Sequence, residues 1–137
     1  MGRIIGIDFG EKRTGLAWTD ADGKIAFPLE GVATADVMTR LGQICANEPV
    51  SGFVLGHPKR LDGRDTHSTD GARRLAGLIA HAFPDKFVAL VDERFSSTIA
   101  QNALFAGGAS RAKRRDKHLL DSVSAAVILQ GYLMQSQ

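Results

Sequence analysis

The chain has 137 residues, which is enough for one well-buried core, and we expect residues 1–137 to form a single domain. A hydrophobic content of 44% argues against disorder, and a formal net charge of +2 does not by itself require a nucleic-acid partner. Cys45 is the one cysteine in the sequence, so it cannot form an internal disulfide, and we expect it to be buried. No apolar run is long enough to span a membrane and no signal-peptide pattern opens the chain, so we expect a cytoplasmic protein.

The first half of the chain predicts a small antiparallel meander followed by a helix. Three strands are expected, at residues 4–8, 16–19 and 24–32. Asp8 ends the first strand, an Asp-Gly turn joins the other two, and Pro28 places the third strand near an edge of the sheet. Thr34 is a predicted N-cap for a helix that Pro49 ends.

The second half alternates buried strands with helices. Strands are expected at residues 51–56 and 87–91, and helices at residues 68–83, from Ser96 or Ser97 to residue 106, and at 118–134. In the helix at 68–83, Leu75, Leu78, Ile79 and Ala82 are predicted to face inward. A strand reached through a helix is expected to run parallel to the first. The fold class is therefore α/β, with a mixed five-stranded sheet flanked by helices.

Three acidic residues lie at the ends or faces of predicted core elements. Asp8 is on the first strand, Glu93 follows the last strand, and Asp121 is one turn into the final helix. With the later strands placed beside the first, these acids meet at one edge of the sheet. Clustered carboxylates repel one another unless divalent cations neutralise them, and oxygen ligands favour Mg²⁺ or Mn²⁺. Asp92 competes with Glu93, because adjacent strand residues face opposite sides.

Each acid also has an explanation that requires no metal. Asp8 could pair with Lys12 or Arg13, and Glu93 could belong to a salt-bridge network with Arg94. The acid in the final helix could simply complement the helix dipole. The sequence leaves these alternatives open.

Positive charge is concentrated close to the predicted acidic site. The segment before the final helix contains Arg111, Lys113, Arg114, Arg115 and Lys117. Loops predicted at the same edge of the sheet contribute Lys12, Arg13, Lys59, Arg60 and Arg64. A phosphate backbone at a metal site needs Lys and Arg alongside the carboxylates, although such a basic segment could also be a solvated loop. His118 shares a helical face with Asp121 and could hold a proton or a phosphate there, or be an ordinary helix-start residue.

Four segments of the chain resemble the YqgF/RuvX family in their order and spacing. They are GIDFGEKRTGLA (6–17), LGHPKRLDGRDT (55–66), VDERFSST (91–98) and LLDSVSAAVILQGYL (119–133). The resemblance implies an RNase H-like fold with strand order 3-2-1-4-5, related to the RuvC Holliday junction resolvases. Members of the family are described as pre-16S rRNA nucleases that act at the 5′ end, and were earlier described as Holliday junction resolvases.

The resemblance also implies roles for individual residues. Asp8, Glu93 and Asp121 would form a metal-dependent nuclease site, supported by Arg13, Arg94 and Thr98. RuvC resolvases carry a further acid three residues after the last helix aspartate, where this chain has Ser124. His118 stands where some resolvases have a histidine.

The function expected from these features is a Mg²⁺- or Mn²⁺-dependent endonuclease, a hydrolase that acts in 5′-end maturation of pre-16S rRNA. Its partner would be nucleic acid, as structured RNA or branched DNA, with the ribosomal small-subunit precursor as a candidate, and the protein would be a monomer or homodimer. The alternatives are a Holliday junction resolvase, a module that binds nucleic acid without cutting it, and an actin-like ATPase. The ATPase would need a second lobe around the nucleotide, which 137 residues do not supply.

Overall fold

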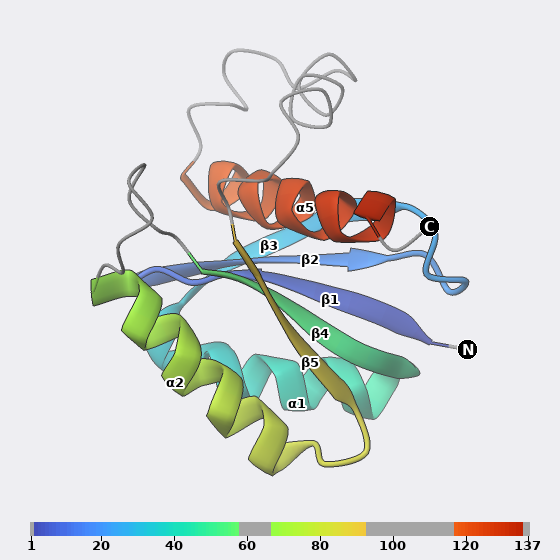
Figure 1. Ribbon diagram of the computed structural model, residues 1–137, viewed down its shortest axis with the longest axis horizontal. Helices are drawn as coiled ribbons and strands as arrows, with labels where there is room; N and C mark the ends of the chain where they lie inside the picture. The colour runs from blue at the N-terminus through green and yellow to red at the C-terminus, as the bar shows by residue number, and fades with distance from the viewer. Residues whose placement is uncertain (1, 58–66, 93–116, 136–137) are drawn as a thin grey trace.

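The computed structural model describes residues 2–57, 67–92 and 117–135, which form a five-stranded sheet with helices on both faces (Figure 1). In chain order the elements are β1 (Arg3–Asp8), β2 (Arg13–Thr19), β3 (Ala26–Ala33), a 3-10 turn (Thr34–Asp36), α1 (Val37–Asn47), β4 (Val50–His57), α2 (His67–Ala82), β5 (Phe87–Asp92) and α5 (Lys117–Gln135). None of the helices in these ranges combines the length and apolarity that crossing a membrane requires. The predicted helix after Ser96 or Ser97 lies outside the described residues.

The sheet has the strand order β3-β2-β1-β4-β5, which confirms the predicted mixed topology. The β1–β2 and β2–β3 pairs are antiparallel, and the β1–β4 and β4–β5 pairs are parallel. Pro28 is in the edge strand β3, as predicted. The parallel strands end together, because Asp8 pairs with Gly56 and His57 pairs with Asp92. The carboxyl ends of β1, β4 and β5 therefore form one edge of the sheet.

Helices α1 and α2 cover one face of the sheet and α5 covers the other (Figure 1). Successive side chains along each strand point to opposite faces of the sheet, so they contact either α1 and α2 or α5. In β1, Ile5 and Ile7 are fully buried in the larger core beneath α1 and α2. Gly6 faces the opposite way, and a Cβ placed on it would lie 2.8 Å from the Leu129 Cβ in α5. This alternation determines which strand residues can meet α5.

Thr34 does not cap α1, so that prediction was wrong. The N-cap residue of α1 is Asp36, and no side chain makes a capping hydrogen bond there. The Thr34 hydroxyl instead donates to the Gly10 carbonyl oxygen at 2.6 Å and pairs with the Thr14 hydroxyl at 2.9 Å. Its backbone N–H also donates to the Lys12 carbonyl oxygen at 3.0 Å. The Thr34 hydroxyl therefore bonds to residues distant in the sequence. These hydrogen bonds fix the β1–β2 connection to the end of β3.

Two burial predictions also need correction. In α2 the buried stripe is Ala72, Leu75, Ala76 and Ile79, whereas Leu78 is 58% exposed and Ala82 is exposed too. Positions 72, 75, 76 and 79 lie on one helical face, and Leu78 falls outside it. Cys45 is half-buried against the larger core rather than fully buried, and this burial raises the pKa of its thiol.

The turn before β3 contains a carboxylate with a pH-dependent contribution to stability. Gly23 has a φ of +72°, and Asp20 Oδ1 accepts hydrogen bonds from the backbone N–H groups of Lys24 (2.7 Å) and Ile25 (3.1 Å). These bonds lower the pKa of Asp20. Because the folded-state pKa is below the unfolded one, the ionised carboxylate stabilises the fold above the unfolded pKa, and this is lost as the pH falls.

We therefore expect Asp20→Ala to lower the thermal midpoint near neutral pH and to have a smaller effect at about pH 3. Thermal unfolding of the wild type and the variant at both pH values measures the difference. Asp22→Ala, in the same exposed turn, is the control for loss of an acidic side chain. An Asp20→Ala deficit of equal size at both pH values would contradict the assignment.

Candidate active site

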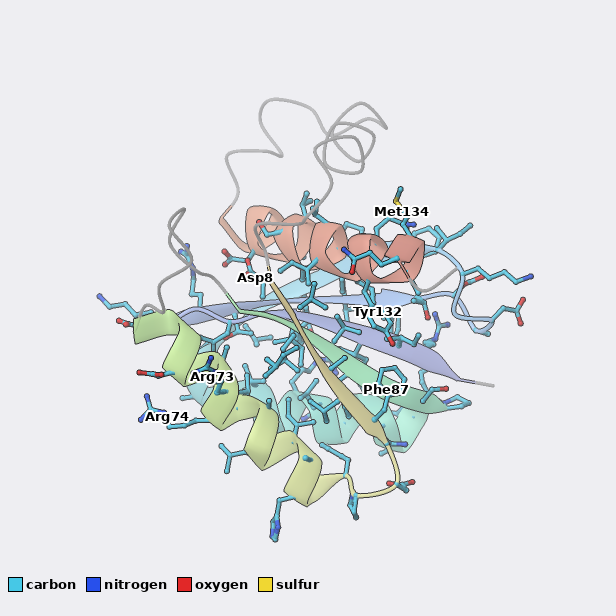
Figure 2. The ribbon with its side chains drawn as sticks, in the orientation of Figure 1. Asp8, Arg73, Arg74, Phe87, Tyr132 and Met134 are labelled. Carbon is cyan, nitrogen blue, oxygen red and sulfur yellow. The ribbon has the colours of Figure 1, made fainter. Side chains whose placement is uncertain are left out.

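Asp8 lies at the carboxyl end of β1 on the face covered by α5. It has the same parity as Gly6, which faces α5, and the opposite parity to Ile7, which is buried beneath α1 and α2. Figure 2 shows Asp8 beneath the beginning of α5. The side chain is half-buried. An acid that ends an otherwise apolar strand is therefore placed between the sheet and a helix terminus.

Gly15 brings Asp121 to the same place. It pairs directly with Asp8 across the β1–β2 ladder, so both residues face α5. A Cβ on Gly15 would lie 1.8 Å from the Asp121 carbonyl oxygen, which means that the α5 backbone rests directly on β2 at this point. The structure thereby brings Asp8 and Asp121 together, although they are far apart in sequence.

Asp121 forms an ion pair with Arg13, the first residue of β2. The Arg13 Nε lies 3.1 Å from Asp121 Oδ2, and the two side chains are 41% and 24% exposed. Oδ2 itself is buried, yet among the described residues it accepts no aligned hydrogen bond. The short distance and the missing hydrogen bond are compatible, because the Nε–H direction does not point at Oδ2. The contact is therefore an electrostatic pair at a buried carboxylate oxygen that lacks an aligned hydrogen bond.

An open pocket of about 550 Å³ lies beside this pair and is lined by Gly10, Lys12, Arg13 and Asp121. The backbone of its floor is fixed, because the Thr34 hydroxyl and N–H hold the carbonyl groups of Gly10 and Lys12. The side chains of Lys12 and Arg13 are exposed. The pocket thus places two cations next to Asp121, which is an arrangement that can accept a phosphate group.

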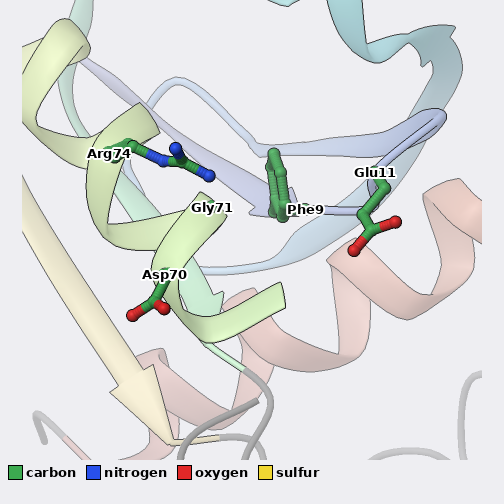
Figure 3. Close-up of a pocket in the computed structure, with 5 residues that line it drawn as sticks. All are labelled: Phe9, Glu11, Asp70, Gly71 and Arg74. Atoms are coloured by element: carbon green, nitrogen blue, oxygen red, sulfur yellow. The ribbon is translucent and has the colours of Figure 1, made fainter. Parts of the chain in front are cut away.

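Phe9 anchors the end of β1 on the opposite face. Its ring lies against Gly71 in α2, where an added Cβ would fall 2.3 Å from the ring Cε1 atom. The Phe9 side chain also lines a second open pocket, of about 320 Å³, and Figure 3 shows it between Glu11 and Arg74. This packing holds the residue that follows Asp8, and so helps to fix the Asp8 backbone.

Comparison with known proteins identifies the family. Residues 2–135 match the family model RuvX, described as Holliday junction resolvase. The chain belongs to the RuvX family. It is 45% identical to a protein of Porphyromonas gingivalis over 97% of this chain and 96% of that one. It is 38% identical to proteins of Parabacteroides distasonis and Christiangramia forsetii, again over 97% and 98% of this chain and 95% and 100% of theirs. All three carry the name "Putative pre-16S rRNA nuclease".

Solved structures agree on the fold of this RuvX chain. The structure of Thermus thermophilus RuvC in complex with a Holliday junction substrate superposes with a TM-score of 0.61, and covers 98% of this chain and 96% of that one. A second T. thermophilus RuvC structure gives a TM-score of 0.57. At 15% identity the likeness shows the fold, which is RNase H-like as predicted.

Many of the predicted site residues lie outside the part of this RuvX chain that the structure describes. They are Lys59, Arg60, Arg64, Glu93, Arg94, Thr98, Arg111, Lys113, Arg114 and Arg115. Lys117 and His118 begin α5, but their side chains also lie outside the described residues. Within residues 2–57, 67–92 and 117–135 there is no group of three His, Cys, Asp or Glu side chains that could hold a metal.

The residues that are described nevertheless fit a hard divalent cation. Asp8 and Asp121 supply carboxylate oxygens, the donor type that Mg²⁺ and Mn²⁺ prefer. Asp121 Oδ2 is buried and accepts no aligned hydrogen bond from the described residues, and its one printed partner is the Arg13 guanidinium, 3.1 Å away. A cation at this oxygen would satisfy it.

Sequence reasoning did not foresee two features of the site. The first is the role of Gly15, which accommodates the α5 backbone on β2. Arg13 was considered as a partner of Asp8, and the structure pairs it with Asp121. The signal for the first was present: Gly6, Gly15 and Ala17 share one face of neighbouring strands, and small residues allow a helix to approach closely.

Proposed function

We propose that this protein is a cytoplasmic, metal-dependent nuclease that cuts phosphodiester bonds at the 5′ end of pre-16S rRNA. The observation that supports this most directly is the meeting of Asp8 and Asp121 beneath α5, beside Lys12 and Arg13. The names of its relatives supply the substrate. The single free cysteine, Cys45, suits a reducing compartment.

Asp8, Asp121 and Glu93 would hold Mg²⁺ or Mn²⁺. In β5, Phe87 stacks on Tyr132 of α5, and Val91 packs against the same α5 core, so the next position of that parity is 93 rather than 92. Strand β4 separates β5 from β1, a distance of about 10 Å between strands, and this favours the longer glutamate. When bound, the ion activates water and stabilises charge on the reacting phosphate.

The chain's own cations would hold the substrate. Lys12 and Arg13 face the pocket beside Asp121 and would bind the phosphates that flank the scissile bond. Arg94, Thr98 and His118 would support the site. A track of cations would follow the backbone on either side; it comprises Lys59, Arg60, Arg64, Arg111, Lys113, Arg114, Arg115 and Lys117.

Side-by-side cleavage assays test this function. A pre-16S rRNA 5′ fragment and a four-way DNA junction are incubated with the protein in Mg²⁺, in Mn²⁺ or in chelator. We expect the RNA to be cut in the presence of either metal and left intact in chelator. Preferential cutting of the junction would favour the resolvase activity named in the family description. Tight binding of both substrates with no cleavage in any metal would instead identify a binding module.

A further inference from the structure

We infer that Arg13 is an exchangeable counter-ion: it pairs with Asp121 until a divalent cation takes that carboxylate, and then turns to a substrate phosphate. The inference rests on the proposed function. It adds a thermodynamic coupling between metal binding and nucleic-acid binding, carried by one side chain.

The first argument is competition for one atom. Arg13 Nε lies 3.1 Å from Asp121 Oδ2, the same buried oxygen that lacks an aligned hydrogen bond among the described residues. A guanidinium at that distance occupies the space in which a cation would bind to Oδ2. Arg13 therefore stabilises the carboxylate of Asp121 in the absence of metal, and metal binding has to displace it.

The second argument is that the displacement is easy. The Arg13 side chain is 41% exposed, and ion pairs of this kind are weak because water screens them and both side chains lose freedom. A dication carries twice the charge of the guanidinium and therefore has the stronger Coulombic attraction to the carboxylate. The open pocket beside the pair gives the freed guanidinium room to move while its backbone remains anchored in β2.

The third argument concerns the position of the Arg13 guanidinium after a metal has displaced it from Asp121. It remains at the rim of the pocket with Lys12, facing the space in which a phosphate backbone would pass Asp8 and Asp121. A phosphate that binds Arg13 likewise releases Asp121 for the metal. Because such coupling is reciprocal, metal and nucleic acid each improve the affinity of the other by the same factor.

Two variants separate this exchange from a general effect of charge. Arg13→Gln removes the competitor, whereas Lys12→Gln removes an equal charge from the same pocket. In the described part of the chain, Lys12 makes no ion pair with Asp121. We expect Arg13→Gln to bind Mn²⁺ about two- to fivefold more tightly than wild type, measured by calorimetry without nucleic acid. Lys12→Gln should stay within about 1.5-fold of wild type.

Binding of a labelled pre-16S rRNA 5′ fragment, in chelator and in Ca²⁺, provides the second measurement, with a gel to verify that the RNA stays intact. Arg13→Gln should weaken binding and reduce the gain in affinity that Ca²⁺ gives to the wild type. Lys12→Gln should weaken binding equally in both conditions. Unchanged or weaker Mn²⁺ binding by Arg13→Gln overturns the exchange even if wild type binds Mn²⁺ and cleaves. Absence of Mn²⁺ binding by wild type overturns the exchange and the nuclease proposal together.

Discussion

Replacing Asp8 by asparagine should reduce metal-dependent cleavage by at least about 100-fold while the protein remains folded. The substitution keeps the shape of the side chain at the end of β1 and removes the carboxylate of the residue that lies beside Asp121. The remaining acid cannot neutralise a divalent cation to the same extent. Initial cleavage rates at saturating Mg²⁺ or Mn²⁺, with circular dichroism to check folding, measure the effect.

The matched control is Asp22→Asn, which makes the same chemical change in the exposed turn between β2 and β3. It should cleave at the wild-type rate. Calorimetric titration with Mn²⁺ should show weaker binding for Asp8→Asn alone. Cleavage by Asp8→Asn at close to the wild-type rate would exclude this carboxylate from the reaction.

Local chemistry in the sequence was sufficient to predict most of the fold. Apolar runs bounded by turn residues predicted every described strand, and Pro28 was expected at an edge because it cannot donate a hydrogen bond to a neighbouring strand. The helix-linked strands were expected to be parallel, and β4 and β5 are. These features depend on residues close together in the chain, which is why one sequence is enough to predict them.

The sequence did not predict the partner of a side chain where that partner is distant along the chain. The Thr34 hydroxyl was expected to cap a nearby helix. In the folded protein it bonds instead to Gly10 and Thr14, which lie next to it because β3 pairs with β2. The sequence left open whether Arg13 pairs with Asp8, and the approach of α5 to Gly15 brings Asp121 within 3.1 Å of Arg13. Residue types predicted that acids and cations would gather at this edge. The partner of each one depends on how closely helix and sheet approach, and a sequence pattern does not state that distance.

That close approach leads to the second large prediction, Gly15→Ala. The added methyl group would lie 1.8 Å from the Asp121 carbonyl oxygen and 2.3 Å from its carbonyl carbon, so the α5 backbone has to move away from β2. Backbone cannot rotate aside as a flexible side chain can. We expect a loss of at least about 2 kcal/mol in the free energy of unfolding, measured by denaturant titration.

Gly77→Ala is the control, because it makes the same change at an exposed position of α2 where the new Cβ has no neighbour within 4 Å. It should stabilise the protein by about 0.5–1 kcal/mol, since alanine favours the helix. Gly15→Ala should also lose cleavage activity at temperatures where it remains folded, because the shift of α5 carries Asp121 away from Asp8. Wild-type stability and wild-type cleavage in Gly15→Ala would show that the contact between β2 and α5 does not position the two acids.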